Sequence, residues 1–141
     1  MTEYKKPLPA PTPADEPYWR ALIEQQLVLP RCTECRSYQW YPRLMCRACG
    51  SLSLEWEPVR GRGVVFSYTT QHHRTGSRFD DELPYTIVVV DLAEAPGVRM
   101  TGRLTNCAPE AVEIGLPVES WYEAVTPEVT FLRFRPVVSG Q

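Results

Sequence analysis

The sequence predicts a mainly β protein that begins with one short helix. Three observations support this prediction: a helix-type apolar pattern near the N-terminus, two closely spaced cysteine pairs, and five β-type segments beyond residue 62. The 141 residues, 43% of them hydrophobic, are sufficient for one domain with a small appendage. In chain order, we expect a proline-rich tail at 1–14, a helix at 15–28, a cysteine-rich module at 29–59 and a β-barrel at 60–137.

Prolines occupy positions 7, 9, 11 and 13 of the tail. Proline at every second position excludes a helix and favours an extended, polyproline-like segment. The pattern leaves two possibilities open: the tail is disordered, or it lies against another surface.

The segment "DEPYWRALIEQQL", which starts at residue 15, has the pattern of an amphipathic helix. Asp15 suits the N-cap and Pro17 the first turn, and apolar residues recur at helical spacing from Trp19 to Ile23. Tyr18 and Trp19 give this short helix a large apolar surface. We expect that surface to be buried either on the body of the protein or on a partner.

Two C-x-x-C pairs with ten residues between them lie in "LPRCTECRSYQWYPRLMCRACGS". In each pair, or knuckle, two thiolates converge while backbone N–H groups face the sulfurs; two knuckles complete a tetrahedral site that zinc fills, with no open position for catalysis. We therefore predict a zinc ribbon at 29–59 with a structural Zn²⁺, and a hairpin in the spacer between the knuckles. The predicted ligands are Cys32, Cys35, Cys46 and Cys49.

Other chemistries use similar cysteine spacings. Iron in a rubredoxin-like site has the same geometry and stays open as an alternative. Two disulfides are disfavoured in a chain without an export signal, and a thioredoxin-like redox pair needs only one C-x-x-C at the start of a helix. The fifth cysteine, Cys107, stands alone and is expected to be a small buried side chain.

Five segments rich in β-branched and aromatic residues follow the cysteine module, and a helical turn that Gly115 stops separates the third from the fourth. In the first segment, alternation is expected to place Val64, Phe66 and Tyr68 on one face. Five short strands in this arrangement suit a Greek-key barrel of the OB type. The segments are 63–73, 85–92, 98–104, 117–125 and 129–136.

Charge and hydropathy argue against a membrane protein and against a nucleic-acid-binding protein. No apolar run approaches the ~20 residues that cross a membrane, and the N-terminus lacks the apolar centre of a secretory signal, so we expect a cytoplasmic protein without a membrane partner. The net charge is −2 and the only lysines are Lys5 and Lys6, which argues against a nucleic-acid partner. Six arginines but only three glutamates lie between positions 31 and 62. Arginine binds phosphates or carboxylates in a forked geometry, but an arginine-rich coding bias with a solvated surface is the favoured explanation.

The sequence contains no side-chain set with a recognisable catalytic pattern. His72 and His73 are the only histidines, and as neighbours on a strand they would point to opposite faces. The acidic run Asp80, Asp81 and Glu82 is expected to be a solvated loop rather than a metal site. We therefore predict no catalytic activity for the chain alone, and a general base at His72 is the less favoured alternative.

Short motifs follow one another in a defined order over residues 16–136. The motifs are "YW" (18–19), "LVLPRC" (27–32), "YPR" (41–43), "CRACG" (46–50), W-x-x-x-x-GRG (56–63), "PY" (84–85), "GRL" (102–104), "IG-x-PV" (114–118) and "FRP" (134–136). In that order, they resemble the acyl-CoA-associated proteins catalogued as domain of unknown function 35.

The resemblance implies an N-terminal helix, a rubredoxin-like zinc ribbon and a C-terminal OB-fold. It also implies a non-catalytic accessory subunit of acyl-CoA and lipid metabolism, which binds a thiolase, a MaoC-type hydratase or an aldolase and helps to accommodate the CoA thioester. One position departs from the family: Arg36 ends the first knuckle where glycine is usual, whereas Gly50 is kept in the second. A left-handed backbone at Arg36 would cost about 1–2 kcal/mol.

Five residues are candidates for contact with a ligand or partner. Trp40, Tyr41 and Arg43 lie between the knuckles, and Arg60 and Arg62 lie in "RGRG". In that motif, glycine would let the backbone approach a ligand, and arginine is suited to the phosphates of CoA. The alternative for Trp40 and Tyr41 is that they only pack the ribbon against the barrel.

Two other functions fit parts of the pattern. A single-stranded nucleic-acid-binding protein would use the ribbon and the barrel, with Tyr68, Trp121 and Tyr122 as stacking platforms. A rubredoxin-like electron carrier would hold iron in the four-cysteine site and would be red.

Overall fold

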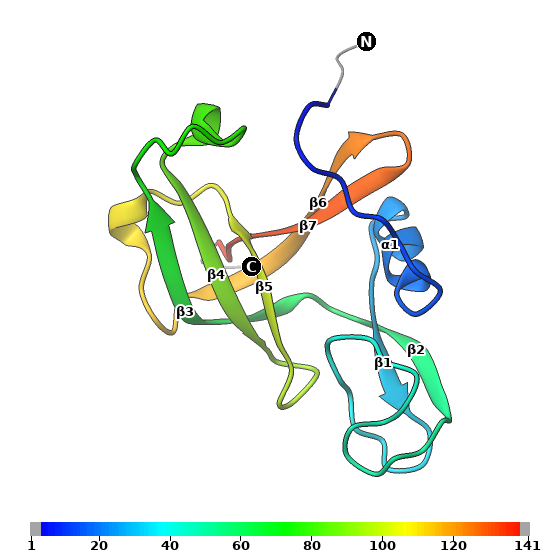
Figure 1. Cartoon of the computed structure of the whole chain (residues 1–141). Helices are drawn as coiled ribbons and strands as arrows, with labels where there is room; N and C mark the ends of the chain where they lie inside the picture. Colours follow the sequence, from blue (N-terminus) through cyan, green and yellow to red (C-terminus); the bar gives the residue numbers. More distant parts are fainter. Residues whose placement is uncertain (1–3, 139–141) are drawn as a thin grey trace.

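The computed structural model describes residues 4–138. Within that range it contains one α-helix and two separate sheets, one of two strands and one closed into a five-stranded barrel. Figure 1 shows the barrel on one side and the two-stranded sheet with its long loops on the other, with the helix above that sheet. The predicted class, mainly β with an N-terminal helix, is confirmed. No helix of the described range is long and apolar enough to cross a membrane.

The two-stranded sheet pairs β1 (Leu27–Cys32) with β2 (Leu54–Val59) in antiparallel orientation. The segment 33–53, which joins these strands, contains three of the four paired cysteines and none of the named strands. An isolated bridge between Arg31 and Tyr38 is the one ladder contact described for this segment. The hairpin predicted in the spacer is therefore wrong, because the paired strands flank the cysteine loops instead of lying between them.

The barrel strands are β3 (Arg62–Gln71), β4 (Tyr85–Leu92), β5 (Arg99–Leu104), β6 (Pro117–Thr126) and β7 (Val129–Pro136). Their order around the barrel is β3-β4-β5-β7-β6, and the parallel pairing of β5 with β7 completes the closure. Closure buries alternate side chains, and Val88, Val90 and Phe134 have no exposed surface. A short 3-10 helix, η2 (Pro109–Ala111), lies between β5 and β6. The five predicted strands and the OB-type arrangement are confirmed.

An irregularity in β3 changes the face of one side chain. The pairing of β3 with β4 shifts register directly after Val65, which leaves Phe66 as an extra residue. Beyond the shift, Tyr68 lies opposite Val88, which is completely buried in the barrel. Tyr68 therefore lies on the Val88 side of the sheet and not on the side of Val64 and Phe66 as expected, and its side chain is 42% exposed there.

Helix α1 (Glu16–Ile23) is shorter than the predicted helix at 15–28, because the chain turns into β1 through a left-handed residue, Gln25 (φ 60°). Its apolar side is buried on this chain itself. Tyr18 and Leu22 belong to the main core, and the helix contacts β1, β6 and β7. The sequence left open whether the helix packs on the body of the protein or on a partner, and in the structure it packs on the body of the protein.

The proline-rich tail also lies on the body of the protein and runs past the β6–β7 hairpin and α1 (Figure 1). Lys6 forms ion pairs with the last two residues of η1 (Asp80–Glu82), a short 3-10 helix between β3 and β4. The backbone carbonyl of Lys5 accepts a hydrogen bond of 2.7 Å from the guanidinium of Arg78. The acidic run therefore holds the tail through two ion pairs of Lys6.

The glycines of "RGRG" allow the strands of the barrel to approach one another closely. A Cβ atom at Gly61 would lie 2.0 Å from the hydroxyl oxygen of Ser120, and one at Gly63 would lie 2.2 Å from the backbone oxygen of Asp91. Ser120 belongs to β6 and Asp91 to β4. Because the close approach is made within the barrel, the expectation that these glycines admit a ligand is not supported.

We expect Gly61→Ala to destabilise the barrel, because the added Cβ would collide with Ser120. The expected loss in the free energy of unfolding is about 1–3 kcal/mol, measured by urea denaturation. In the double variant Gly61→Ala/Ser120→Gly the colliding side chain is absent, so most of that loss should be recovered. Simple additivity of the two single variants would show that the collision is not the cause.

Candidate functional site

Four cysteine sulfurs converge at the end of the β1–β2 sheet. The Sγ atoms of Cys32, Cys35, Cys46 and Cys49 all lie within 4.8 Å of one another, and two of the pairs are 3.6 Å apart. In a tetrahedral site with zinc–sulfur bonds of about 2.3 Å, the sulfurs are about 3.8 Å apart. The donor set and its spacing therefore fit one four-coordinate metal ion, with no coordination position left for a substrate.

Each knuckle directs backbone N–H groups at its buried sulfur. The Cys32 sulfur accepts hydrogen bonds of 3.4 Å from the N–H groups of Glu34 and Cys35, and the Cys46 sulfur accepts one of 3.4 Å from the N–H of Ala48. The N–H of Cys35 is the main cause that lowers the pKa of Cys32. Because a thiol must lose its proton to bind a metal, this geometry favours ligation.

The two knuckles share one backbone geometry. The N–H of Arg36 donates to the carbonyl of Cys32 at 3.0 Å, and the N–H of Gly50 donates to that of Cys46 at 2.8 Å. Both donor residues have a left-handed backbone conformation, with φ of 64° at Arg36 and 80° at Gly50. The left-handed backbone expected at Arg36 is confirmed. Its guanidinium lies at the surface, 3.5 Å from the Glu57 carboxylate.

Trp40 packs into the junction between the ribbon and α1. Its ring centroid lies 4.6 Å from that of Tyr18, a buried residue of α1. Trp40 is half-buried and contacts the main core. These contacts support a packing role for Trp40, in which its aromatic neighbour is Tyr18 of α1.

Tyr41 and Asp15 connect the spacer between the knuckles to the start of the helix. The hydroxyl of Tyr41, a half-exposed residue, donates a hydrogen bond of 2.5 Å to one carboxylate oxygen of Asp15. The other oxygen accepts hydrogen bonds from the backbone N–H and the hydroxyl of Thr12, at 2.7 and 3.1 Å. Asp15 is 5% exposed and occupies the N-cap position of α1, as predicted, but its side chain forms no hydrogen bond that caps the helix.

These hydrogen bonds favour the ionised form of Asp15. Burial alone would raise the pKa of this carboxyl, but the hydrogen bonds from Tyr41 and Thr12 outweigh burial, and the pKa is lowered. The bond to Asp15 also raises the pKa of the Tyr41 hydroxyl. Sequence reasoning missed this junction, because no local pattern relates residues 26 positions apart.

Gln39 is a second buried polar residue that sequence reasoning missed. It is 2% exposed. Its side-chain amide donates to the carbonyl of Met45 at 3.3 Å, and its side-chain oxygen accepts from the N–H of Arg47 at 3.0 Å. These two bonds fold the spacer back on itself in place of the predicted hairpin.

The folded spacer leaves an open hollow of about 490 Å³ beside the metal-ligand cluster. Three of the five candidate contact residues meet there. Arg60 and Arg62 lie instead at the start of the barrel, where Arg62 is 3.5 Å from the carboxylate of Glu119 and Arg60 is exposed. The residues that line the hollow are Trp40, Tyr41, Arg43, Met45, Cys46 and Arg47.

The two histidines and the consecutive pair Trp121 and Tyr122 do not form a common site, and the third stacking candidate, Tyr68, is 42% exposed on β3. β3 ends immediately before His72, so His72 and His73 lie in an exposed loop and not on the strand as expected. Trp121 and Tyr122 are consecutive on β6 and therefore face opposite sides of it. The indole N–H of Trp121 donates to the hydroxyl of Thr105 at 2.8 Å.

Cys107 lies outside the four-cysteine cluster. It is half-buried rather than buried as expected, and it packs against the core. Burial raises the pKa of its thiol, which favours the protonated form over a metal-binding thiolate.

Two family models match consecutive parts of the chain. Residues 19–55 match the rubredoxin-like zinc ribbon domain of ChsH2, and residues 56–123 match the C-terminal OB-fold domain of ChsH2. A DUF35 domain-containing scaffold protein from Methanocaldococcus jannaschii is 30% identical over 84% of this chain and 88% of its own length. The chain belongs to this DUF35 (ChsH2) family. The resemblance seen in the sequence is thus confirmed.

Further comparisons extend this result. A probable enoyl-CoA hydratase alpha subunit from Thermomonospora curvata is 37% identical over 98% of this chain, which spans 43% of the length of that protein. Among solved structures, the Ltp2–ChsH2 (DUF35) aldolase matches with a TM-score of 0.83 and 32% identity, over 93% of this chain and 100% of the matched chain. A DUF35 protein of unknown function from Sulfolobus solfataricus shares the fold, with a TM-score of 0.61 at 18% identity.

We expect Asp15→Asn to lower the free energy of unfolding at pH 7 by about 1–3 kcal/mol, because asparagine keeps only one acceptor oxygen, and its NH2 group would face either the Tyr41 hydroxyl or the Thr12 donors. The loss should depend on pH. The pKa of Asp15 is lowered in the folded protein, so its contribution is present above the ordinary value of 3.8 and disappears as the pH falls through the folded value. Urea denaturation between pH 7 and about pH 3 measures the difference from wild type.

Tyr41→Phe is the matched control for this experiment. It removes one donor and leaves the carboxylate with Thr12, so we expect a smaller loss in the free energy of unfolding than with Asp15→Asn. A difference between wild type and Asp15→Asn that stays constant from pH 7 to pH 3 would show that ionised Asp15 does not stabilise the fold.

Proposed function

We propose that this protein is a non-catalytic accessory subunit that binds an acyl-CoA-processing enzyme. The observation that best supports this function is the likeness to the Ltp2–ChsH2 (DUF35) aldolase, which extends over 93% of this chain and 100% of the matched chain. An enoyl-CoA hydratase or an aldolase is the favoured partner, because the names of the relatives contain these two activities. A thiolase is the third candidate, from the family resemblance.

We propose that the ribbon holds a structural Zn²⁺ through Cys32, Cys35, Cys46 and Cys49. The spacing of the sulfurs and the match to a zinc ribbon domain support this assignment. Bound zinc would supply folding free energy, with apparent values of about 10–16 kcal/mol for structural sites in small zinc-finger peptides. Four sulfur ligands saturate the ion, which is consistent with a role in structure rather than in catalysis.

A role in accommodating the CoA thioester is a second part of the proposal. The hollow beside the cysteine cluster is open to solvent, so this chain would supply one wall of such a site and the enzyme the other. Arg60 and Arg62 at the barrel junction are the candidates for the CoA phosphates, because a guanidinium binds phosphate in a bidentate geometry. Arg43 lines the hollow itself.

The two alternative functions have less support. Stacking of nucleic-acid bases needs aromatic side chains on one accessible face, whereas Trp121 and Tyr122 face opposite sides of β6. An electron carrier needs iron in the four-cysteine site. Metal analysis separates that alternative from structural zinc.

We expect the purified protein to contain one zinc ion per chain, measured by inductively coupled plasma mass spectrometry. Cys46→Ser should lose the zinc and most of the ordered ribbon, because this sulfur is 1% exposed and no other cysteine can replace it. Cys107→Ser is the matched control and should keep the zinc, since Cys107 lies outside the cluster. A red protein with one iron per chain would contradict the zinc assignment and support the electron carrier.

We expect the affinity-tagged chain, purified from its native organism, to retain an enoyl-CoA hydratase, an aldolase or a thiolase that mass spectrometry identifies. The enzyme and the chain should co-elute in gel filtration. Calorimetric titration with acyl-CoA, on the chain alone and on the complex, then tests the CoA contact. Absence of a stable enzyme complex together with absence of acyl-CoA binding in either titration would overturn the proposed function.

A further inference from the structure

The loops of the ribbon expose apolar side chains that the described part of the chain leaves uncovered. Leu44 and Leu52 are 78% and 73% exposed, and Met45 is 53% exposed. Leu44 and Leu52 line one shallow hollow of about 180 Å³, and Met45 lines the larger hollow beside it. These three residues therefore form one patch, which we call the ribbon tip.

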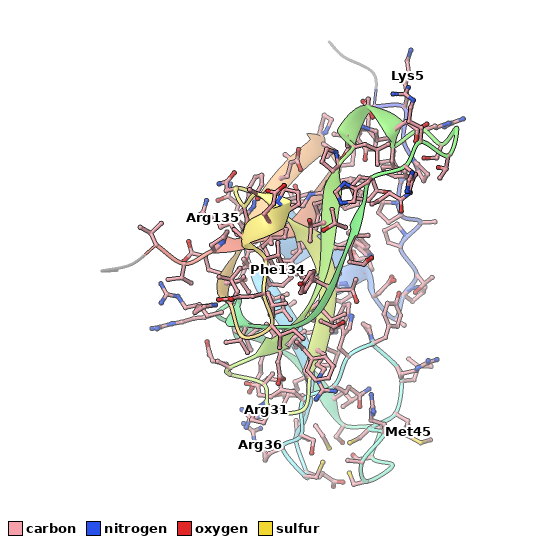
Figure 2. The ribbon with its side chains drawn as sticks, turned by 90° about the vertical axis from the view of Figure 1, so that its left-hand side faces the viewer. Lys5, Arg31, Arg36, Met45, Phe134 and Arg135 are labelled. Atoms are coloured by element: carbon pink, nitrogen blue, oxygen red, sulfur yellow. The ribbon has the colours of Figure 1, made fainter. Side chains whose placement is uncertain are left out.

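Two arginines border the ribbon tip, and neither has an acidic partner among the described residues. Arg43 lines both hollows and Arg47 lines the larger one, and neither forms an ion pair within residues 4–138. Two other arginines of the ribbon, Arg31 and Arg36, share one glutamate. Figure 2 shows these two on one side of the ribbon and Met45 on the other. The two ion-paired arginines and the ribbon tip thus lie on different sides of the ribbon.

The ribbon tip has a defined shape before any partner binds. The carbonyl of Met45 is hydrogen-bonded to buried Gln39, and the next residue, Cys46, is a ligand candidate of the metal site. A preformed surface loses little conformational entropy on association, which favours specific binding.

We propose that the ribbon tip is the surface through which this chain docks on its acyl-CoA-processing enzyme, and that the enzyme meets it with an apolar patch bordered by Asp or Glu carboxylates. This inference rests on the proposed function. Charge complementarity supports it: an apolar centre next to two guanidinium groups that form no ion pair within residues 4–138 matches the composition of a protein interface with an acidic partner. Buried contacts of Leu44 and Leu52 would supply affinity, and Arg43 would set orientation.

The outer face of the barrel is the main competing surface, and it suits a partner less well. Phe66 is 46% exposed there, but the guanidinium of Arg99 lies 3.8 Å from its ring centroid, so this cation is already engaged within the chain. Ile114 provides a matched control for the two leucines. It lies in the loop before β6 and is 72% exposed, which is similar to the exposure of Leu44 and Leu52.

The test measures the affinity of each variant for the enzyme that co-purifies with the wild-type chain. Leu44→Asp/Leu52→Asp should raise the Kd by at least about tenfold, and Arg43→Glu by at least about fivefold. Ile114→Asp should change the Kd by less than about twofold. Zinc content and far-UV circular dichroism establish that each variant is folded, and Leu44→Ser/Leu52→Ser replaces the aspartate variant if that one does not fold.

The possible results separate this inference from the proposed function. Wild-type binding that the ribbon-tip variants leave unchanged, or that Ile114→Asp weakens equally, overturns the docking site and leaves the accessory function intact. If the wild type forms a homodimer and Leu44→Asp/Leu52→Asp is monomeric, the ribbon tip binds a second copy of the chain, and the inference is overturned. If the wild type retains no acyl-CoA-processing enzyme, both the inference and the proposed function fail.

Discussion

The ribbon depends on the convergence of four cysteine sulfurs, because the segment that they hold has almost no core of its own. Between residues 33 and 53, the buried residues are Gln39, Pro42 and Cys46. Ordering a chain costs about 1–2 kcal/mol per residue, which so little burial cannot offset. Ligation of a metal ion by the four sulfurs, with apparent values of about 10–16 kcal/mol for structural zinc sites, would offset a large part of this cost. The left-handed knuckles, the hollow beside them and the exposed ribbon tip all follow from this constraint.

Asp15 connects the ribbon to the tail and to the start of helix α1. Its carboxylate accepts hydrogen bonds from Tyr41 in the spacer and from Thr12 in the tail, and the contact of Trp40 with Tyr18 lies at the same junction. A buried carboxylate is costly unless its hydrogen bonds are made, so its partners must all be in place together. This requirement favours one orientation of the spacer relative to α1.

The barrel, in contrast, satisfies many of its charges internally. Glu119 on β6 pairs with Arg62 and with Arg135, and Glu123 pairs with Arg133 on the neighbouring strand β7. These cross-strand pairs leave few free charges on that part of the barrel. The ribbon, which lies to one side of the barrel in Figure 1, combines exposed apolar groups with two arginines that form no ion pair within residues 4–138. Such a division suits an accessory subunit, in which the barrel supports the surface that the ribbon presents.

The sequence by itself determined the order of the elements, the five barrel strands, the four-cysteine set and the left-handed backbone of Arg36. All of these follow from short-range patterns: alternation along a strand, the spacing of C-x-x-C, and the preference for glycine at one backbone position. The ordered motifs also identified the family. Only the tertiary structure decided the roles of Asp15 and Gln39, the contact of Gly61 with β6, and the place of the tail. Each of these depends on which distant segments meet in space, and local periodicity contains no information about that.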